Sequence, residues 1–280
     1  MRTIAHMSDL HFGRVRTEIV QALLADVAAL SPTLVVISGD LTQRASRAQY
    51  EAAEAFLARM PVPWVAVPGN HDIPTLNPIT RFTRPLSRFR HHVSRDAQPF
   101  WMDEEIAVCG INTARSWVWD WSHGRVSWRQ MESVREAMRD VPPDRFRIVF
   151  AHHPFLPPPT APGTRLVGRA VPALKALEEA GVEMLLAGHL HRAYTGDIMS
   201  HHTHVARSIL VAQASTATST RLRSEPNAYN LITIDGPSVT FEVRSWEGAS
   251  FMPGLVTRFR RDGSRWIRVE TDPGSGIAAG

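Results

Sequence analysis

Apolar runs and helical stripes alternate along the first 190 residues of the chain. A continuous apolar run such as 34–37 is typical of a strand that is covered on both faces of its sheet. Strand-like runs occupy residues 4–7, 34–37, 64–67, 106–111, 147–151 and 182–187. Helical spacing of apolar residues is found over 17–30, 45–60, 127–139 and 171–180. The alternation predicts an α/β fold with two layered sheets and helices outside them.

The pattern changes after about residue 192, where strands follow one another and no further helix is predicted. These strands are expected over 196–200, 208–213, 229–234, 238–246 and about 256–269. Neither an internal repeat nor a flexible linker interrupts the chain, so residues 1–270 are predicted to form a single domain. The Gly/Ala-rich residues 271–280 are predicted to be a disordered tail.

Residues 73–100 break the alternation and are predicted to form a cap-like insert. Its apolar residues share one helical face and its arginines another, and Pro85 divides it into two helices. The two faces consist of Phe82, Leu86, Phe89 and Val93, and of Arg81, Arg84, Arg88 and Arg95. Two interpretations stay open. Either the arginines are solvated, or the insert caps the site and they bind a second phosphate or an acidic group.

Composition excludes several classes of protein. The chain has 280 residues, of which 44% are hydrophobic and 21% charged, as in a soluble globular protein. The single Cys109 excludes an internal disulfide framework and cysteine-rich zinc sites. No apolar run reaches the roughly 18 to 20 residues that span a bilayer, and the first residues lack the pattern of a signal peptide. A reducing cytoplasm is the predicted compartment.

The net charge of +4 is modest for this length. No run of basic residues is interleaved with stacking aromatics, so no stable nucleic-acid partner is expected. Arginine makes up nearly all of the basic side chains, because Lys175 is the single lysine. Arginines in other loops are candidates for the rim of a phosphate-binding cleft, namely Arg115, Arg165, Arg169, Arg221 and Arg223.

Polar clusters follow five of the predicted strands. They are Asp9-x-His11, Gly39-Asp40, Gly69-Asn70-His71-Asp72, His152-His153 and Gly188-His189-x-His191. The clusters combine carboxylates, imidazoles and one carboxamide without a thiolate. That donor set suits Mn, Fe or Zn, often in pairs. Ligands usually bind at the carboxyl ends of strands in an α/β sheet, so the sequence predicts a metal site there.

The order DxH, GD, GNHD, HH, GHxH resembles the calcineurin-like metallophosphoesterases over residues 3 to about 192. The closest resemblance is to bacterial members similar to the class III cyclic-nucleotide phosphodiesterases. This resemblance implies a four-layer αββα sandwich of two mixed β-sheets flanked by helices. It also implies two divalent or trivalent metal ions, with Mn, Fe and Zn as the candidates.

The resemblance also implies a role for each cluster. The first metal would be held by Asp9, His11 and His191, and the second by Asn70, His152 and His189. Asp40 would bridge both ions. His71 would protonate the leaving group or stabilise the transition state, so Asp40 and His71 are the predicted catalytic residues. The family motif aligns its ligand with His152, and His153 is expected on the opposite side.

Departures from the family pattern narrow the class. Gln43 stands where purple acid phosphatases have Tyr and where protein phosphatases have an Asp that supports the catalytic His. His11 also stands where the purple acid phosphatases have Gly. Both classes are therefore disfavoured, and the orientation of His71 is not explained. Asp72 is interpreted as a turn or cap residue.

The predicted activity is hydrolysis, by metal-activated water, of a phosphodiester in a small nucleotide-type substrate, with a 3′,5′-cyclic nucleotide as the leading candidate. The alternative is a pyrophosphohydrolase of a lipid-linked sugar nucleotide of the UDP-diacylglucosamine type, and a nuclease is a weaker alternative. Contact with a membrane surface is expected only under the lipid alternative. A homodimer stays open, because Trp246, Phe251 and Trp266 fit either a dimer contact or the back of the core.

Overall fold

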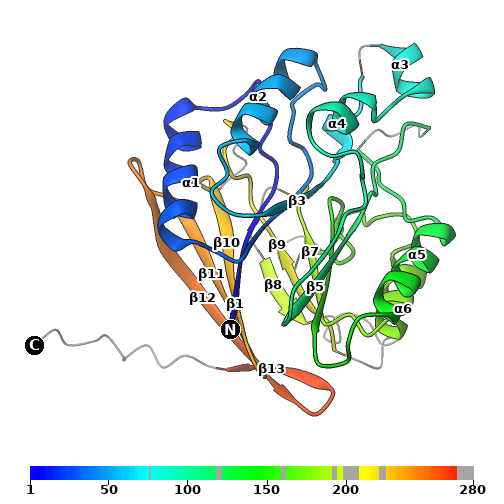
Figure 1. Ribbon diagram of the computed structural model, residues 1–280, viewed down its shortest axis with the longest axis vertical. Coiled ribbons are helices and arrows are strands. Elements are labelled where there is room, and N and C mark those ends of the chain that lie inside the picture. Colours follow the sequence, from blue (N-terminus) through cyan, green and yellow to red (C-terminus); the bar gives the residue numbers. More distant parts are fainter. Residues whose placement is uncertain are drawn as a thin grey trace, which may run out of the picture.

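Two β-sheets lie face to face in the computed structural model, with helices on the outer side of each (Figure 1). The structure describes residues 1–75, 77–117, 122–158, 162–190, 194–197, 208–220 and 225–269. The predicted four-layer αββα sandwich is therefore confirmed. The predicted tail at 271–280 lies outside the described residues.

The first sheet has seven strands in the order β13-β12-β11-β10-β1-β2-β3. Its parallel half consists of β1 (Arg2–Met7), β2 (Leu34–Ser38) and β3 (Trp64–Val67). Its antiparallel half consists of β10 (Ala228–Asp235), β11 (Ser238–Trp246), β12 (Phe251–Asp262) and β13 (Arg265–Val269). The two halves join where β1 pairs with β10 in antiparallel register.

The second sheet has six strands in the order β4-β5-β6-β7-β9-β8. Its parallel centre consists of β5 (Ile106–Ile111), β6 (Phe146–Ala151), β7 (Met184–Ala187) and β9 (Leu210–Gln213). The antiparallel edge strands are β4 (Phe100–Met102) and β8 (Tyr194–Asp197). The sequence did not predict β4, which is three residues long and half exposed.

Helices cover the outer face of each sheet. The first sheet is covered by α1 (Thr17–Leu30) and α2 (Arg47–Leu57), and the second by α5 (Trp128–Arg139) and α6 (Ala170–Glu179). Between the sheets lies a core of strand residues such as Val36, Phe150 and Met184, all fully buried. Each central strand therefore buries both of its faces, which explains the continuous apolar runs in the sequence.

One predicted strand is wrong in its extent. Residues 256–269 form not one strand but parts of two, β12 and β13, which pair with each other in antiparallel register. The turn between them contains Gly263 with a φ of +58°. Glycine adopts this left-handed conformation without the steric penalty of a side chain, so the chain reverses there.

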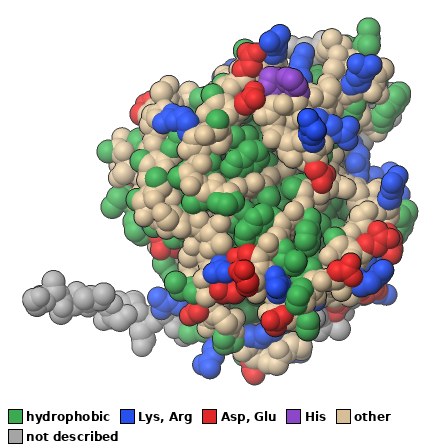
Figure 2. Space-filling model, in the orientation of Figure 1, with side chains coloured by type: hydrophobic (Ala, Val, Ile, Leu, Met, Phe, Trp, Pro, Cys, Tyr) green, Lys and Arg blue, Asp and Glu red, His purple; other side chains and the backbone are tan. Residues whose placement is uncertain are grey.

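The insert contains two short helices, α3 (Pro78–Thr83) and α4 (Ser87–His92). Leu86 and Phe89 are buried in the core that α2 also lines, as the apolar pattern predicts. The arginines do not form one solvated face, because Arg81 is buried and Arg88 donates a hydrogen bond to the carbonyl of Ala45 at 2.5 Å. Arg84 is exposed, and Figure 2 shows several Lys or Arg side chains in the region of α3 and α4.

The late aromatic residues belong to the core. Phe251 and Trp266 are buried, and Trp246 is partly buried against the same cluster as Phe251. These residues therefore form the back of the core, and they offer no support for a dimer contact. Within the described ranges, no helix has the length and apolar character that crossing a membrane requires.

A buried ion pair joins α1 to the antiparallel strands. Arg244 on β11 donates from Nε and Nη2 to the two carboxylate oxygens of Asp26, at 2.7 and 2.8 Å. The hydroxyl of Tyr229 on β10 donates to the same carboxylate. Asp26 and Arg244 expose 13% and 9% of their side chains, so removing either partner leaves the other charge poorly solvated.

We expect Asp26→Ala to lower the free energy of unfolding by about 3 kcal/mol. The variant leaves the Arg244 guanidinium with Glu242 alone as a carboxylate partner among the described residues, and it removes the acceptor of the Tyr229 hydroxyl. Urea denaturation followed by circular dichroism measures the change. Glu51→Ala, which breaks the exposed pair with Arg47 on α2, serves as the control and should change stability little. Equal losses in the two variants would contradict a structural role for the Asp26–Arg244 pair.

Candidate metal centre

The carboxyl ends of five parallel strands meet at one edge, between the two sheets. Asp9 follows β1, Asp40 follows β2, and a single 3₁₀ turn, η1 (Asn70–Asp72), follows β3. His152 follows β6 and His189 lies just beyond β7. The structure thus brings together all the predicted site residues except His191, which lies outside the described residues.

The first candidate ligand group contains Asp9, His11 and Asp40. All three side chains are buried. Nε2 of His11 lies 3.4 Å from Oδ1 of Asp9 and 3.7 Å from Oδ2 of Asp40. These three side chains therefore point toward one small volume.

The second candidate ligand group surrounds Nε2 of His152. This atom lies 3.1 Å from Oδ1 of Asn70, 3.2 Å from Nδ1 of His189 and 3.4 Å from Oδ2 of Asp40. Oδ2 of Asp40 therefore faces His11 on one side and His152 on the other. This is the position that a bridging carboxylate needs.

The spacing of these atoms fits metal coordination. Ligand atoms of Asp9, Asp40 and His152 all lie within 4.8 Å of one another, and so do those of His152, His153 and His189. Nitrogen and oxygen ligands bind such ions at about 2.0–2.2 Å, so neighbouring ligands are separated by roughly 3.0–3.5 Å. The separations around His152 Nε2 lie within this range, and the donor set without a thiolate suits Mn, Fe or Zn.

Backbone and side-chain partners set the orientation of the two adjacent histidines. Nδ1 of His152 lies 2.7 Å from the carbonyl oxygen of Ser38, to which it can only donate, and this leaves Nε2 available as a ligand. Nδ1 of His153 bonds to the hydroxyl of Thr113 at 2.7 Å. His153 does not lie on the opposite side as predicted, because its ring centroid is 4.9 Å from that of His189. Strand β6 ends at Ala151, so strand alternation no longer applies at these residues.

The histidines and aspartates at this site shift the pKa values of one another. Burial alone would lower the pKa of His152, but the carboxylates of Asp40 and Asp9 and the hydrogen bond to Ser38 together outweigh burial and raise it to about 9. Burial likewise opposes protonation of His11, whose pKa is nevertheless raised by Asp9 and Asp40. Burial would raise the pKa of Asp40, yet the neighbouring imidazoles hold it well below its usual value. The buried carboxylates therefore require nearby positive charge.

Several of the candidate ligands have strained backbone conformations. Asp9, His11, Asp40 and His189 have φ values of +55°, +50°, +53° and +71°. Residues with a side chain avoid this left-handed region at a cost of roughly 1–2 kcal/mol each. Such strain persists where the surrounding structure enforces it, and it is typical of functional sites.

Glycine is required where the loops approach most closely. A Cβ atom on Gly69 would collide with the carboxylate of Asp40. A Cβ atom on Gly188 would collide with the hydroxyl of Ser8, which donates to Oδ2 of Asp9 at 2.6 Å. These two glycines let the loops after β3 and β7 reach the carboxylates of the first two strands.

Asp72 joins the loop that carries Asp40 to the loop that carries Asn70. Its Oδ1 accepts from the backbone and hydroxyl of Thr42, and its Oδ2 accepts from the backbone N–H groups of Leu41 and Gly69. Burial and the charge of Asp40 raise the pKa of Asp72 to about 6 despite these hydrogen bonds. The predicted turn residue thus has a larger role, because it fixes two ligand loops relative to each other.

A set of threonine hydroxyls supports the loop after β1. Thr216 and Thr218 donate to the carbonyls of Asp9 and Leu10 at 2.7 Å, and Thr220 donates to that of Arg14 at 3.1 Å. The sequence shows this polar segment but gives no sign of its partners, which lie more than 200 residues earlier. We refer to Thr216, Thr218 and Thr220 as the threonine ladder.

The backbone carbonyl of Gln43 accepts a hydrogen bond from His71, where protein phosphatases would use an aspartate side chain. The carbonyl oxygen of Gln43 lies 2.8 Å from Nδ1 of His71, and the side-chain nitrogen of Gln43 lies 3.3 Å from the same atom. The backbone N–H of His71 donates to Oδ1 of Asp40 at 2.9 Å. Both hydrogen bonds fix the ring beside the candidate ligands, with its centroid 4.9 Å from that of His11.

Three bacterial proteins are similar in sequence to parts of the chain. A probable cyclic nucleotide phosphodiesterase of Synechococcus sp. is 33% identical over 26% of this chain and 32% of its own length. The glycerophosphodiester phosphodiesterase GpdQ of Enterobacter lignolyticus is 28% identical over 55% of this chain and 57% of its own length. A probable cyclic nucleotide phosphodiesterase of Pseudoalteromonas sp. is 29% identical over 68% and 72%. The match thus spans about a third of the length of the Synechococcus protein and just over half of the length of GpdQ.

A solved structure shares the fold at low sequence identity. The purple acid phosphatase PPD1 from yellow lupin (Lupinus luteus) superposes with a TM-score of 0.70 at 13% identity, over 94% of this chain and 54% of its own. This likeness concerns the fold alone. Residues 2–193, well over half of the chain, match the calcineurin-like phosphoesterase family. The match includes the candidate site residues that meet at one edge of the sandwich, and the chain therefore belongs to the calcineurin-like phosphoesterase family.

Proposed function

We propose that the protein is a phosphodiesterase with two metal ions and a small nucleotide-type substrate, a 3′,5′-cyclic nucleotide being the leading candidate. The observation that carries the proposal is the position of Asp40 Oδ2, which faces His11 at 3.7 Å and His152 at 3.4 Å. One carboxylate oxygen between two ligand groups favours a pair of ions over a single one. His191 completes the first group as a predicted ligand.

Bound metal ions would supply Lewis-acid activation of the phosphate and of the attacking water. The chain's own residues hold the ligands in place and limit the negative charge. Asp9 and Asp40 contribute two carboxylates, whereas Asn70 contributes a neutral oxygen that does not add to the repulsion of an anionic substrate. Ser38 holds His152 in the tautomer that can act as a ligand.

His71 is the proposed proton donor to the leaving oxygen. Its Nδ1 is hydrogen-bonded to the Gln43 carbonyl, so Nε2 is the ring nitrogen that we assign to carry the proton to the substrate. The hydrogen bond between its backbone N–H and Asp40 couples its position to the bridging carboxylate. This arrangement explains how the ring is oriented without an acidic side chain at position 43.

The names of two relatives support a cyclic nucleotide as substrate, while that of GpdQ indicates that phosphodiesters of another kind are accepted among its relatives. One observation favours the lipid-linked pyrophosphate as a second candidate. Ile79 and Phe82 on α3 and Trp117 in the loop after β5 are exposed, with the Phe82 and Trp117 rings 4.5 Å apart. An acyl chain or a membrane surface would cover such groups.

A substrate panel separates these candidates. The Mn²⁺-loaded protein is assayed against cyclic AMP, bis-(p-nitrophenyl) phosphate and a UDP-diacylglucosamine. Turnover of the first two supports the proposal, and turnover confined to the lipid substrate would overturn it. Metal analysis of the same sample should give two equivalents per chain.

Two variants distinguish metal binding from proton transfer. Asp40→Asn removes the charge shared by both ligand groups, so we expect metal content below two equivalents and no turnover above background. His71→Ala should keep both metals and lower kcat by about 10²- to 10⁴-fold, the usual contribution of a general acid. Elemental analysis and steady-state kinetics measure both effects.

The exposed His91 on α4 provides a matched control, and His91→Ala should change neither quantity. Loss of metal from His71→Ala equal to that from Asp40→Asn would show that His71 is a ligand instead.

Metal binding should release protons at pH 7. The pKa of His152 is raised from 6.5 to about 9, so its imidazole is protonated in the folded protein before a cation binds and must then lose its proton. Titration calorimetry with Mn²⁺ in two buffers of different ionisation enthalpy measures this release, which should diminish as the pH rises through about 9. Identical binding enthalpies in both buffers would contradict it.

The same shift has a consequence for stability. A histidine with a raised pKa stabilises the fold fully below the pKa of the unfolded chain, and this stabilisation is lost as the pH rises through the folded value. The metal-depleted protein should therefore lose stability between pH 6.5 and about 9. Its thermal midpoint, measured at fixed ionic strength, should fall over this interval more than that of the Mn²⁺-loaded protein.

A further inference from the structure

Three arginines lie together where the chain enters α5 and α6. Arg125 precedes α5, Arg169 is the N-cap residue of α6, and a parallel bridge joins Arg125 to Gly168. Burial lowers the pKa of Arg115, and the positive charges of Arg125 and Arg169 lower it further. The guanidinium group of Arg115 therefore lies close enough to Arg125 and Arg169 to be repelled by both. We call Arg115, Arg125 and Arg169 the arginine cluster.

Within the described part of the chain, no carboxylate forms an ion pair with the arginine cluster. Nη2 of Arg115 donates to the side-chain oxygen of Gln130 at 2.5 Å, and Nη1 of Arg169 donates to the carbonyl of Val126 at 3.1 Å. The Arg169 guanidinium also lies over the ring of Trp128, 5.0 Å from its centroid. The N-terminal ends of α5 and α6 add positive potential at the same place. Such a concentration of positive charge is suited to an anion.

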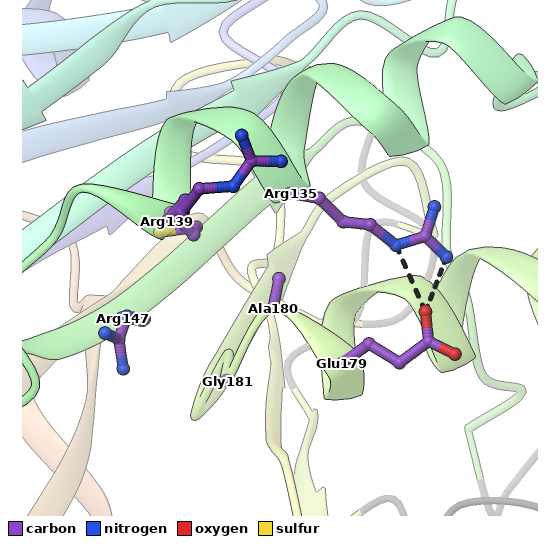
Figure 3. A pocket seen from close by; sticks show the side chains of 7 residues that line it. Arg135, Arg139, Arg147, Glu179, Ala180 and Gly181 are labelled. Carbon is purple, nitrogen blue, oxygen red and sulfur yellow. Dashed lines mark hydrogen bonds and ion pairs between the residues drawn. The ribbon is translucent and has the colours of Figure 1, made fainter.

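A second group of arginines lies near the C-terminal ends of α5 and α6, and it differs from the arginine cluster in being paired with a carboxylate. A pocket of about 420 Å³ is lined by Arg135, Arg139 and Arg147 with Glu179 and Gly181 (Figure 3). There Arg135 donates to Glu179 from two nitrogens, at 3.1 and 2.6 Å. That pocket contains its own counter-charge, whereas the arginine cluster has none among the described residues.

The arginine cluster adjoins the candidate metal centre through His153. Gly124, next to Arg125, packs so tightly on the His153 ring that a Cβ atom there would collide with it. Thr113 accepts the backbone N–H of Arg125 at 2.9 Å and bonds with its hydroxyl to His153. The His153 ring lies 4.9 Å from both His152 and His189, which belong to the second ligand group. One residue thus separates the loop of Arg125 from the ligands.

We propose that the arginine cluster is a second anion-binding subsite, which binds a phosphate group of the substrate other than the one that is cleaved. This inference rests on the proposed phosphodiesterase function and adds to it a preference for those phosphodiesters that carry an additional terminal phosphate. Guanidinium groups bind a phosphate dianion through paired, charge-assisted hydrogen bonds. A subsite beside the second ligand group would also orient the scissile phosphate toward the metals.

A matched pair of substrates tests the subsite. Thymidine 5′-(p-nitrophenyl phosphate) and the same ester with a 3′-phosphate differ only in the additional dianion. At fixed ionic strength, the Mn²⁺-loaded protein should prefer the 3′-phosphorylated ester by at least about tenfold in kcat/KM, the effect of one charge-assisted hydrogen bond. Arg125→Gln, at an exposed position, should lower this preference about tenfold, and Arg115→Gln should do the same if its thermal midpoint is unchanged.

Arg139→Gln removes the same charge at the far end of α5 and should leave the preference as it is. Equal kcat/KM for the two esters, or a preference that Arg139→Gln lowers as much as Arg125→Gln, would overturn the subsite while leaving the phosphodiesterase proposal intact. If neither ester is cleaved, the phosphodiesterase proposal fails for this class, and calorimetry decides on the subsite. Thymidine 3′,5′-bisphosphate should then bind more tightly than thymidine 5′-monophosphate, and Arg125→Gln should abolish the difference; equal affinities would exclude the subsite.

Discussion

The burial of two carboxylates side by side is the constraint on which the rest of the molecule depends. Asp9 and Asp40 are almost fully buried between the sheets, where a lone charge would be strongly destabilising. The imidazoles of His11 and His152 face them, and their pKa values are raised in consequence. Cations that bind here replace protons. Protons on these imidazoles and cations bound at this site would therefore meet the same need for positive charge beside the two carboxylates.

This constraint also accounts for the unusual backbone. Four of the candidate ligands adopt left-handed conformations, and such conformations need external support. Asp72 supplies it for the loops after β2 and β3, and the threonine ladder supplies it for the loop after β1. Each support is a side chain that bonds to backbone groups of a loop distant in sequence. The ligands are therefore held by the whole sandwich and not by their own strands.

Local sequence patterns were sufficient to predict the features that depend on neighbouring residues, namely the strands and the polar residues at their ends. Apolar runs identified the central strands, and the polar residues that end them, from Asp9 to His189, identified the site. Hydrogen bonds across the fold have no local signal, so the partners of Asp72 and the threonine ladder could not be predicted. The position of His153 was predicted wrongly for a related reason: strand alternation was extended past Ala151, where the strand ends, to His152 and His153. The reversal at Gly263 was missed because a single glycine distinguishes one long strand from two.

The pairing of β1 with β10 has a consequence for how the protein is made. Strand β1 begins at Arg2 and finds its partner Ile234 only after most of the chain has left the ribosome. The threonine ladder reaches the loop of Asp9 from 207 residues later. Until those residues are synthesised, the two aspartates are exposed on an incomplete sheet and their loops are unsupported. The candidate metal centre is therefore completed late in biosynthesis, and a chain that ended soon after His191 would carry all five motifs without the strand and the threonine ladder that support them.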